Sequence, residues 1–454
     1  MPPLRRPNEG LLARVNFPLY SIEMLSSRHV LVAGGGGSAK TGVANGFEIY
    51  EIYHNGDRFV AEEVVRHETG PSVVMNCAVR SDGRRSFLVA GQESHCQMYL
   101  VNTKIIDENG VAGKAADGEE KTTTRQRRTS VRQNQNSGIE EIPQEAPPRR
   151  LSFDIKPSDS VQTDFLDREP IQRVVRLSLD CKVMATGGTD GRLRLWNFPR
   201  MTKLRDIAAH SKELDDLDFS PDGKLVVSIA KDGLGVIWDV ASGKEAGTLT
   251  WQPPEGVKYL FKRCRFGVIE DKKNKCRLFT LANPLGKSGK QRGFLQQWDP
   301  ETGTLQRAIG VDESLSALCV RDDGRFVALG TMFSGTVSIH IAFSLQRVLH
   351  IPNAHSMFVT GLQFLPVLSS DGPAISSDAE AAVLSISVDN RICIHSLQYR
   401  RKFPQLISFK RNSKKNFLNL LFLFLSDTLP AWAAIILIVV MLFLTFMLCS
   451  FMGL

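Results

Sequence analysis

The chain has 454 residues, which is enough for two or three average domains or for one large all-β domain with appendages. Its hydrophobic and charged fractions, 43% and 23%, are those of a globular protein, so a sizeable buried core is expected. The formal net charge of +8 would suit nucleic acid, but seven of the positive charges stand between Arg400 and Lys415. With those seven and Asp427 set aside, residues 1–399 carry only +2, which argues against a DNA-binding face because DNA affinity depends mainly on neutralising phosphates.

The eight cysteines are scattered singly, without a CxxC pair, at positions 77, 96, 181, 264, 276, 319, 393 and 449. This pattern is typical of reduced, mostly buried thiols, and it predicts neither disulfides nor zinc. Met1–Asn8 has no apolar stretch of the kind found in a signal peptide. We therefore expect the N-terminal domain to lie in the cytosol.

The first distinctive segment is Gly34–Gly46, which has six glycines in thirteen residues and follows the apolar strand Val30–Ala33. Three interpretations are open: a phosphate-binding loop, a flexible surface hairpin, and a specialised loop whose backbone carbonyls or amides meet an ion or a partner. The phosphate-loop pattern GxxxxGK[ST] would require glycine at position 39, and it should open a helix. Ala39 stands there instead, and Phe47–Ile52 alternates like a strand, so nucleotide binding is disfavoured.

A repeat runs along the rest of the chain. Seven short segments share an apolar alternation that ends near an aromatic residue or a histidine: Gly46–Ile52, Cys96–Val101, Arg192–Phe198, Leu234–Val240, Phe294–Pro300, Thr336–Ala342 and Arg391–Leu397. Most intervals between them are near the ~40–45-residue pitch of WD-type propeller blades. Asp-Gly or Asp-Asn turns precede several of them, as expected for a tight hairpin that leads into the third strand of a blade. The repeat predicts an all-β, seven-bladed WD-type β-propeller over residues 1–399.

The resemblance to the WD-repeat family covers roughly residues 11–399, although only Trp238-Asp239 and Trp298-Asp299 keep the signature dipeptide. In that family a histidine, a turn aspartate and the tryptophan usually form a structural hydrogen-bond network. By this resemblance, His210, Asp232 and Trp238 belong to the scaffold rather than to a catalytic site.

Two further expectations concern the connections of the propeller. Residues 103–168 are rich in charged residues, Gln, Ser, Thr and Pro, and poor in aromatic residues. Such a segment buries too little apolar surface to order itself, so the sequence predicts a disordered insertion between blades. Leu12–Phe17 is a candidate to pair with the last blade around His395, which would close the ring.

The C-terminal end has the pattern of a membrane anchor. A basic juxtamembrane and interfacial segment, residues 400–427, precedes residues 428–454, which carry no charge. Because about 20 apolar residues in a helix cross a hydrocarbon core of ~30 Å, we expect a single C-terminal transmembrane helix that contacts the lipid bilayer. The basic residues upstream should stay in the cytoplasm. The sequence therefore predicts a single-pass protein with a cytosolic N-terminal domain, and the moderate length of the span fits the endoplasmic reticulum.

Three segments resemble the prolactin regulatory element-binding protein family: Val32–Asn45, Asn16–Tyr20 and Ala90–Gln97. Members of this family are guanine-nucleotide exchange factors of the endoplasmic-reticulum membrane, and they act on the small GTPase that starts COPII coat assembly. The resemblance implies a role in ER-to-Golgi protein transport, small GTPase binding without covalent catalysis, and no nucleic-acid partner for the full-length chain.

The resemblance also implies a role for the Gly-rich segment, because in the family this loop protrudes from the first blade, is ordered by a potassium ion and engages the GTPase. It assigns potassium, held mainly by backbone oxygens, to Gly34, Gly35, Gly36, Gly37 and Asn45. It assigns contact with the GTPase to Gly42, Val43 and Asn45. Glycines allow carbonyl groups to converge without Cβ clashes, and an apolar valine in a polar loop suits a pocket on a partner.

Two alternative functions are open at this point. A membrane-anchored WD-repeat scaffold without exchange activity would share every architectural feature and would differ only at the Gly-rich loop. Substitution of Gly36 or Val43 separates the two functions, since it should abolish exchange and leave a scaffold untouched. A DNA-binding transcription regulator, suggested by the family name, conflicts with the low charge of residues 1–399 and with a membrane anchor.

Overall fold

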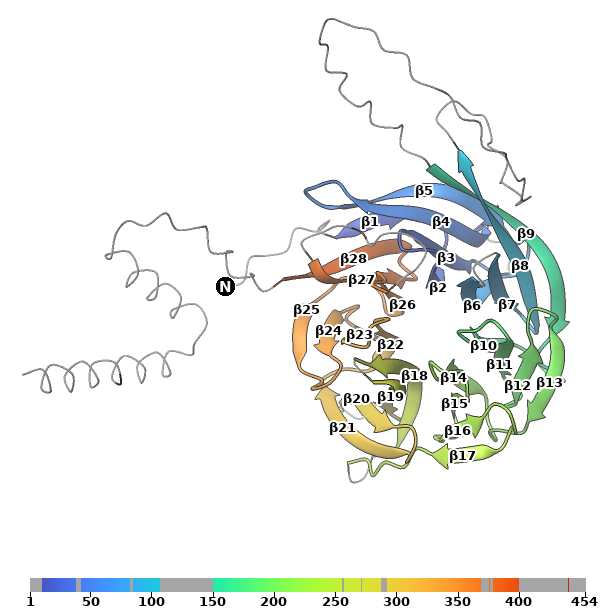
Figure 1. Ribbon diagram of the computed structural model, residues 1–454, viewed down its shortest axis with the longest axis vertical. Coiled ribbons are helices and arrows are strands. Elements are labelled where there is room, and N and C mark those ends of the chain that lie inside the picture. Colours follow the sequence, from blue (N-terminus) through green and yellow to red (C-terminus); the bar gives the residue numbers. More distant parts are fainter. Residues whose placement is uncertain are drawn as a thin grey trace, which may run out of the picture. The chain divides into compact units, whose positions relative to one another are not determined.

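The structure is a computed structural model. It describes residues 10–37, 42–81, 85–106, 150–254, 257–270, 272–286, 292–368, 375, 379–399 and 440. The contacts divide the chain into two units, Met1–Gln398 and Tyr399–Leu454. The first unit consists of seven four-stranded antiparallel sheets that surround a central axis as the blades of a propeller (Figure 1). This arrangement confirms the predicted all-β, seven-bladed fold.

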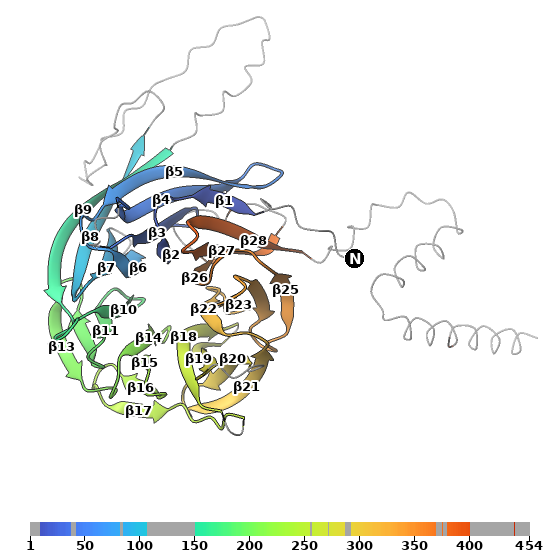
Figure 2. The same ribbon diagram turned by 180° about the vertical axis from the view of Figure 1, so that it is seen from behind.

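The blades follow one another in sequence, and the first strand of each blade lies nearest the axis in both views (Figures 1 and 2). Blade 1 contains β2 (Leu19–Met24), β3 (His29–Gly35), β4 (Asn45–His54) and β5 (Phe59–Glu68). Blade 2 contains β6 (Val74–Ser81), β7 (Ser86–Gln92), β8 (His95–Ile106) and β9 (Arg150–Gln162). Blade 3 contains β10 (Gln172–Leu177), β11 (Val183–Gly188), β12 (Leu193–Asn197) and β13 (Thr202–Ile207).

The remaining four blades complete the circle. Blade 4 contains β14 (Leu214–Phe219), β15 (Leu225–Ala230), β16 (Gly235–Asp239) and β17 (Glu245–Thr248). Blade 5 contains β18 (Tyr259–Ile269), β19 (Lys272–Pro284), β20 (Gly293–Asp299) and β21 (Thr304–Val311). Blade 6 contains β22 (Leu315–Val320), β23 (Phe326–Thr331), β24 (Val337–Ile341) and β25 (Arg347–Ile351). Blade 7 contains β26 (Val359–Phe364), β27 (Ala379–Ser387), β28 (Arg391–Gln398) and the N-terminal strand β1 (Leu11–Arg14).

The repeat found in the sequence marks one strand of every blade. The seven alternating segments coincide with β4, β8, β12, β16, β20, β24 and β28, the third strand of each sheet. Inner strands are buried on both faces because each blade is packed between two neighbours, and every residue of β23 is buried. Outer strands face solvent, and five of the six residues of β13 are exposed.

The ring is closed by the N-terminal strand, as the sequence suggested. β1 pairs with β28 in an antiparallel ladder, with Leu11 opposite Cys393 and Ala13 opposite Ile392. The amide of Val15 then donates to the carbonyl of Asn390 at 2.9 Å. Closure by a strand from the other end of the chain removes the free edge that β28 would otherwise expose.

Histidine, serine and tryptophan side chains brace the turns of some blades. In blade 4, His210 Nδ1 lies 3.1 Å from an Asp232 carboxylate oxygen, and His210 Nε2 lies 2.8 Å from Ser228 Oγ. Trp238 Nε1 donates to the same hydroxyl at 2.8 Å. His355, Asp389 and Ser385 repeat the arrangement in blade 7, where His395 takes the place of the tryptophan. These contacts confirm that His210, Asp232 and Trp238 belong to the scaffold.

The predicted insertion at residues 103–168 is wrong at both of its ends. β8 continues to Ile106, and Arg150–Gln162 forms the outer strand β9 of blade 2. The average composition of the window concealed a strand-like alternation in which Phe153 and Ile155 are each only 7% exposed. Residues 107–149 lie outside the described part of the chain.

The C-terminal unit contributes only Tyr399 and Val440 to the described residues. The predicted juxtamembrane segment, 400–427, and the predicted anchor, 428–454, otherwise lie outside them. Among the residues that are described, no helix has the length and apolar character needed to cross a membrane.

The alternation of strand direction gives the propeller two distinct faces. In each blade, the connection between the second and third strands lies on the same face as the connection that leads into the next blade. We call this the loop face, because it carries the Gly-rich segment between β3 and β4. Connections between first and second strands, and between third and fourth strands, lie on the opposite face.

Candidate functional site

The stem of the Gly-rich loop consists of glycines that are needed for close packing. Gly34 pairs with Gly46, and Gly35 pairs with Asn45, at the end of the β3–β4 ladder. A Cβ added at Gly34 would lie 1.9 Å from the Pro18 carbonyl oxygen, and one added at Gly35 would lie 2.1 Å from Asn45 Oδ1. The Gly35 amide also donates to the Pro18 carbonyl at 3.1 Å. These two positions therefore exclude any side chain, and both are buried.

Asn45 holds the two sides of the loop together. Its side chain is buried, and its Oδ1 accepts from the Gly37 amide at 2.9 Å. Its Nδ2 donates to the carbonyls of Gly37, at 3.3 Å, and Gly70, at 2.9 Å. Its own carbonyl accepts from the Thr69 amide at 2.9 Å. One residue thus ties the Gly-rich loop to the connection that leads into blade 2.

Two other described glycines of the loop, Gly37 and Gly42, have open space around them. Gly37 and Gly42 have φ angles of 80° and 76°, in the left-handed region that favours glycine. A Cβ added at either residue would meet no atom within 4 Å. Their requirement for glycine is conformational, and the adjacent backbone can be approached by a ligand or a partner. Gly36 is half-buried next to Gly37.

Val43 lies between the open glycines and the core. It is half-buried and packs against the apolar cluster that joins blades 1 and 7, which includes Phe17 and Ile392. Part of its surface is therefore used within the propeller, and the rest faces outward between exposed Gly42 and Ala44. The tip of the loop, residues 38–41, lies outside the described residues.

The segment after the loop excludes one of the alternatives raised by the sequence. A phosphate-binding loop opens a helix whose N-terminus meets the phosphates. Here the loop leads directly into strand β4, which begins at Asn45. The structure therefore agrees with the rejection of nucleotide binding at Gly34–Gly46.

A buried carboxylate braces the strand beneath the loop. Glu48 accepts a hydrogen bond from the Tyr50 hydroxyl at 2.6 Å, and it lies 2.9 Å from Arg66. Burial raises the pKa of Glu48, although the hydrogen bond from Tyr50 and the charge of Arg66 oppose the shift. In this blade, Glu48 and Tyr50 occupy the strand that carries the tryptophan in blade 4.

The donor groups of the loop fit a weakly hydrated monovalent cation better than a divalent one. Between Gly34 and Asn45, the described residues offer only neutral carbonyl and amide oxygens, and divalent cations prefer carboxylates. The described part of the chain also holds no cluster of three or more His, Cys, Asp or Glu residues that could bind a metal. The Gly37 carbonyl oxygen and Asn45 Oδ1 each accept a hydrogen bond from the other residue, which holds these two residues side by side.

The residues of the predicted potassium set differ in exposure. Gly34 and Gly35 are buried and paired with Gly46 and Asn45 in the ladder, whereas Gly36 and Gly37 are half-buried. The structure therefore separates a packed stem, Gly34 and Gly35, from an accessible upper part at Gly36, Gly37 and Gly42. The number of glycines in the sequence does not show which of them are packed and which are accessible.

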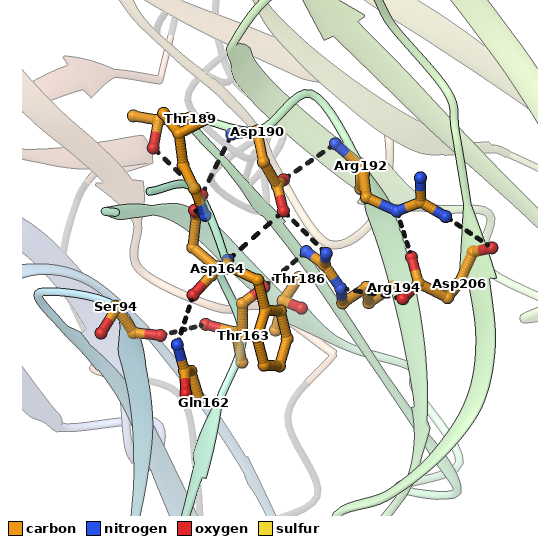
Figure 3. A network of polar contacts seen from close by, with 12 residues as sticks. Ser94, Gln162, Thr163, Asp164, Thr186, Thr189, Asp190, Arg192, Arg194 and Asp206 are labelled. Atoms are coloured by element: carbon orange, nitrogen blue, oxygen red, sulfur yellow. Dashed lines mark hydrogen bonds and ion pairs between the residues drawn. The ribbon is translucent and has the colours of Figure 1, made fainter. Parts of the chain in front are cut away.

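A second ordered connection on the loop face was missed from the sequence (Figure 3). Arg194 is 2% exposed, and its guanidinium donates to the Thr163 carbonyl at 2.6 Å and to the Asp190 carboxylate at 2.7 Å. It also pairs with Asp206 at 3.3 Å. The half-exposed ring of Phe165 lies 4.9 Å from the same guanidinium. The sequence feature that could have indicated this network is the group of charged residues around the Asp190-Gly191 turn, Asp190, Arg192 and Arg194.

The central channel contains a group of charged side chains around a cavity of about 260 Å³. Arg176 lies 3.5 Å from Glu23 and 3.8 Å from Asp216, and Arg265 lies 2.6 Å from Asp216. These pairs link blades 1, 3, 4 and 5. Burial raises the pKa of Glu23, while Arg176 opposes the shift. Because the acids and bases largely neutralise one another, we interpret the group as part of the scaffold.

Comparison with known proteins first defines the class. The family model for the WD domain, G-beta repeat, matches residues 169–197 and 201–239, which span β10 to β12 and β13 to β16. Together with the seven blades and the bracing histidines, this match makes the chain a WD-repeat propeller. The two matched stretches are in the blades whose third strands contain Trp196 and Trp238.

The relatives then define the family. The rat and mouse proteins named guanine nucleotide-exchange factor SEC12 are each 34% identical over 400 residues, covering 87% of this chain and 92% of theirs. SEC12-like protein 2 of Arabidopsis thaliana is 31% identical over 186 residues, covering 40% of this chain and 44% of its own length. The chain belongs to the SEC12 family of guanine nucleotide-exchange factors, which confirms the resemblance seen in the sequence.

Proposed function

We propose that this chain promotes release of GDP from the small GTPase that initiates COPII vesicle budding at the endoplasmic reticulum, and that the Gly-rich loop of blade 1 engages the GTPase. The observation that carries the assignment of the site is the Asn45 clamp. It fixes a loop whose upper backbone, at Gly37 and Gly42, is open on the loop face. Membership of a family of exchange factors supplies the activity.

Exchange of this kind requires binding rather than covalent chemistry. If the loop and the surrounding face bind the nucleotide-free GTPase more tightly than the GDP-bound form, the difference in affinity accelerates GDP release. The residues of this chain then have two tasks. Val43 and the open glycines contact the partner, and Asn45 holds the loop in the shape that fits it.

We further propose that potassium orders the loop. Gly36, Gly37 and Asn45 would hold it through carbonyl and amide oxygens, while Gly34 and Gly35 shape the stem beneath. The bound cation would supply a positive charge that fixes converging backbone oxygens. The neutral donor set between Gly34 and Asn45 supports this choice over a divalent cation.

The uncharged segment at residues 428–454 supports a final element of the proposal, a single C-terminal transmembrane helix. It would hold the exchange factor on the endoplasmic-reticulum membrane, with the propeller in the cytosol. Activation of the GTPase would then be confined to that membrane.

GDP release from the COPII-initiating GTPase, followed by nucleotide fluorescence with the full-length chain in liposomes, tests the proposal. We expect the chain to accelerate release in potassium buffer and to act more weakly in sodium buffer. Equal rates of GDP release in the two buffers would contradict the role of potassium but would leave the proposed exchange activity intact. No acceleration by the folded protein would leave a membrane-anchored scaffold as the function.

A further inference from the structure

Three exposed apolar side chains lie on the loop face at the boundary between blades 6 and 7, and blade 7 is the neighbour of the blade that carries the Gly-rich loop. Phe333 is 75% exposed, Met357 48% and Phe358 37%. Phe333 lies in the connection between the second and third strands of blade 6, and the other two residues lie in the connection from blade 6 to blade 7. We call these three residues the apolar patch.

Backbone contacts join the two connections that carry the apolar patch. The His355 amide donates to the Gly335 carbonyl at 3.1 Å. A Cβ added at Gly335 would lie 2.7 Å from the Met357 carbonyl oxygen, so the two connections touch. The Phe358 carbonyl accepts from Ser387 Oγ at 2.8 Å, which fixes the end of the patch to blade 7.

The exposed ring of Phe333 stands on a rigid support. Glu313 Oε1 accepts from the amides of Phe333, at 2.6 Å, and Ser334, at 2.5 Å. Its other oxygen accepts from Ser334 Oγ at 2.6 Å. A connection ordered in advance loses little conformational entropy on binding, which makes an exposed aromatic residue an effective anchor. The carboxylate of Glu313 is used to hold the backbone.

The strand that follows the apolar patch contacts the blade that carries the Gly-rich loop. Thr360, two residues after Phe358, donates through its hydroxyl to the Leu19 carbonyl of blade 1 at 2.7 Å. The preceding carbonyl, that of Pro18, accepts from Gly35 at the base of the loop. Val43 packs against the cluster between blades 1 and 7 and so lies on the side of the loop nearest the patch.

We propose that the apolar patch is a second contact for the small GTPase, so that one partner is gripped by the Gly-rich loop and by Phe333, Met357 and Phe358 at the same time. This inference rests on the proposed function. Aromatic residues and methionine are enriched in the cores of protein interfaces, and an exposed group of them calls for an apolar partner surface. β28 ends at Gln398 on the opposite face, so the chain's own continuation begins away from the patch.

The test compares two phenylalanines of the same blade on opposite faces. Phe343, in the connection between β24 and β25, is 61% exposed and serves as the matched control for Phe333. Full-length wild-type chain, F333D and F343D in liposomes are assayed for GDP release from the COPII-initiating GTPase at subsaturating concentration. Thermal unfolding of each variant verifies folding, and Phe333→Ala provides a variant without a new charge.

We expect F333D to lower the exchange rate about 10-fold and Phe333→Ala to lower it less, with F343D at the wild-type rate. Wild-type activity together with an unchanged F333D rate would overturn the inference and leave the proposed function intact. Loss of self-association in F333D, measured by sedimentation at an unchanged exchange rate, would also overturn it. An inactive wild-type chain would instead defeat the proposed function on which the inference rests.

Discussion

The connections between the second and third strands of blades 1 and 4 occupy the same place in the repeat but are built differently. In blade 4 the four residues Lys231–Leu234 close the turn, and Asp232 is held by His210 from the neighbouring connection. In blade 1 the connection comprises the nine residues 36–44. The side-chain amide of Asn45 joins it, through Gly37 and Gly70, to the connection that leads into blade 2.

The difference is that blade 1 lacks the histidine, aspartate and tryptophan contacts of blade 4 and has a longer, glycine-rich connection in their place. In blade 4, contacts among His210, Asp232, Ser228 and Trp238 fix the four-residue turn between β15 and β16. Blade 1 has Tyr50 and Glu48 on its third strand, bonded to each other, and its turn is free to lengthen. The loop then depends on Asn45 and on glycines, so changes there should affect exchange, while changes in blade 4 should affect stability.

The largest expected effect is that of a charge at the apolar position of the loop. Val43→Asp should lower the rate of GDP release at least about 30-fold, because an unpaired carboxylate would be buried against the partner. Val240→Asp is the control, since Val240 is also half-buried and packs against a core cluster, but on the opposite face of blade 4. A similar loss of exchange in both folded variants would contradict a specific role for Val43.

Removal of the clamp should have the next largest effect. Asn45→Ala removes three side-chain hydrogen bonds that hold Gly37 and Gly70. We expect exchange to fall about 10-fold and the free energy of unfolding to fall by about 1–3 kcal/mol, because three side-chain hydrogen bonds are lost. Nucleotide fluorescence and urea unfolding measure the two quantities. An unchanged exchange rate would show that the loop does not need the clamp.

The corresponding change in blade 4 sharpens the comparison. His210→Ala removes the contacts that the imidazole makes with Asp232 and Ser228, so it should cost about 1–3 kcal/mol of stability. Nucleotide exchange, measured at a temperature well below the midpoint of thermal unfolding, should stay at the wild-type rate. If His210→Ala slowed exchange as much as Asn45→Ala, the two connections would not differ in function.

The smallest effect is expected from single methyl groups. Gly37→Ala forces a side chain into a left-handed conformation on the open part of the loop, and Gly56→Ala does the same on the opposite face of blade 1. Both should destabilise by about 1 kcal/mol. Only Gly37→Ala should slow exchange, by roughly threefold, because its methyl group lies at the partner surface. Equal exchange rates for the two variants would place the contact elsewhere.

Much of the scaffold could be predicted because its signals are local. The third strand of each blade has an alternating pattern, and the Asp-Gly and Asp-Asn turns mark its start. The outer strand β9 was missed because few apolar residues, such as Phe153 and Ile155, stand within a long polar window. The bracing of blade 7 by His355 depends on residues 30 or more positions apart, and single-residue patterns do not display such pairs.

The candidate site was only partly predictable for a different reason. Six glycines in thirteen residues identify an unusual loop, but they do not show which glycines are packed and which are open. That division comes from Pro18 and Asn45, which contact Gly34 and Gly35 only once the blades are assembled. The position of Phe333 on the same face as the loop likewise depends on the assembled ring, since the two segments are far apart in sequence.

Hydrogen–deuterium exchange of the full-length chain, with and without the nucleotide-free GTPase, tests the central claim most directly. The account predicts protection on the loop face, in residues 34–46 and in the connections that contain Phe333 and Phe358. It predicts no change in the opposite-face connections at residues 55–58 and 342–346. Protection confined to the opposite face, or an unprotected Gly-rich loop in a stable complex, would contradict the assignment of the exchange site.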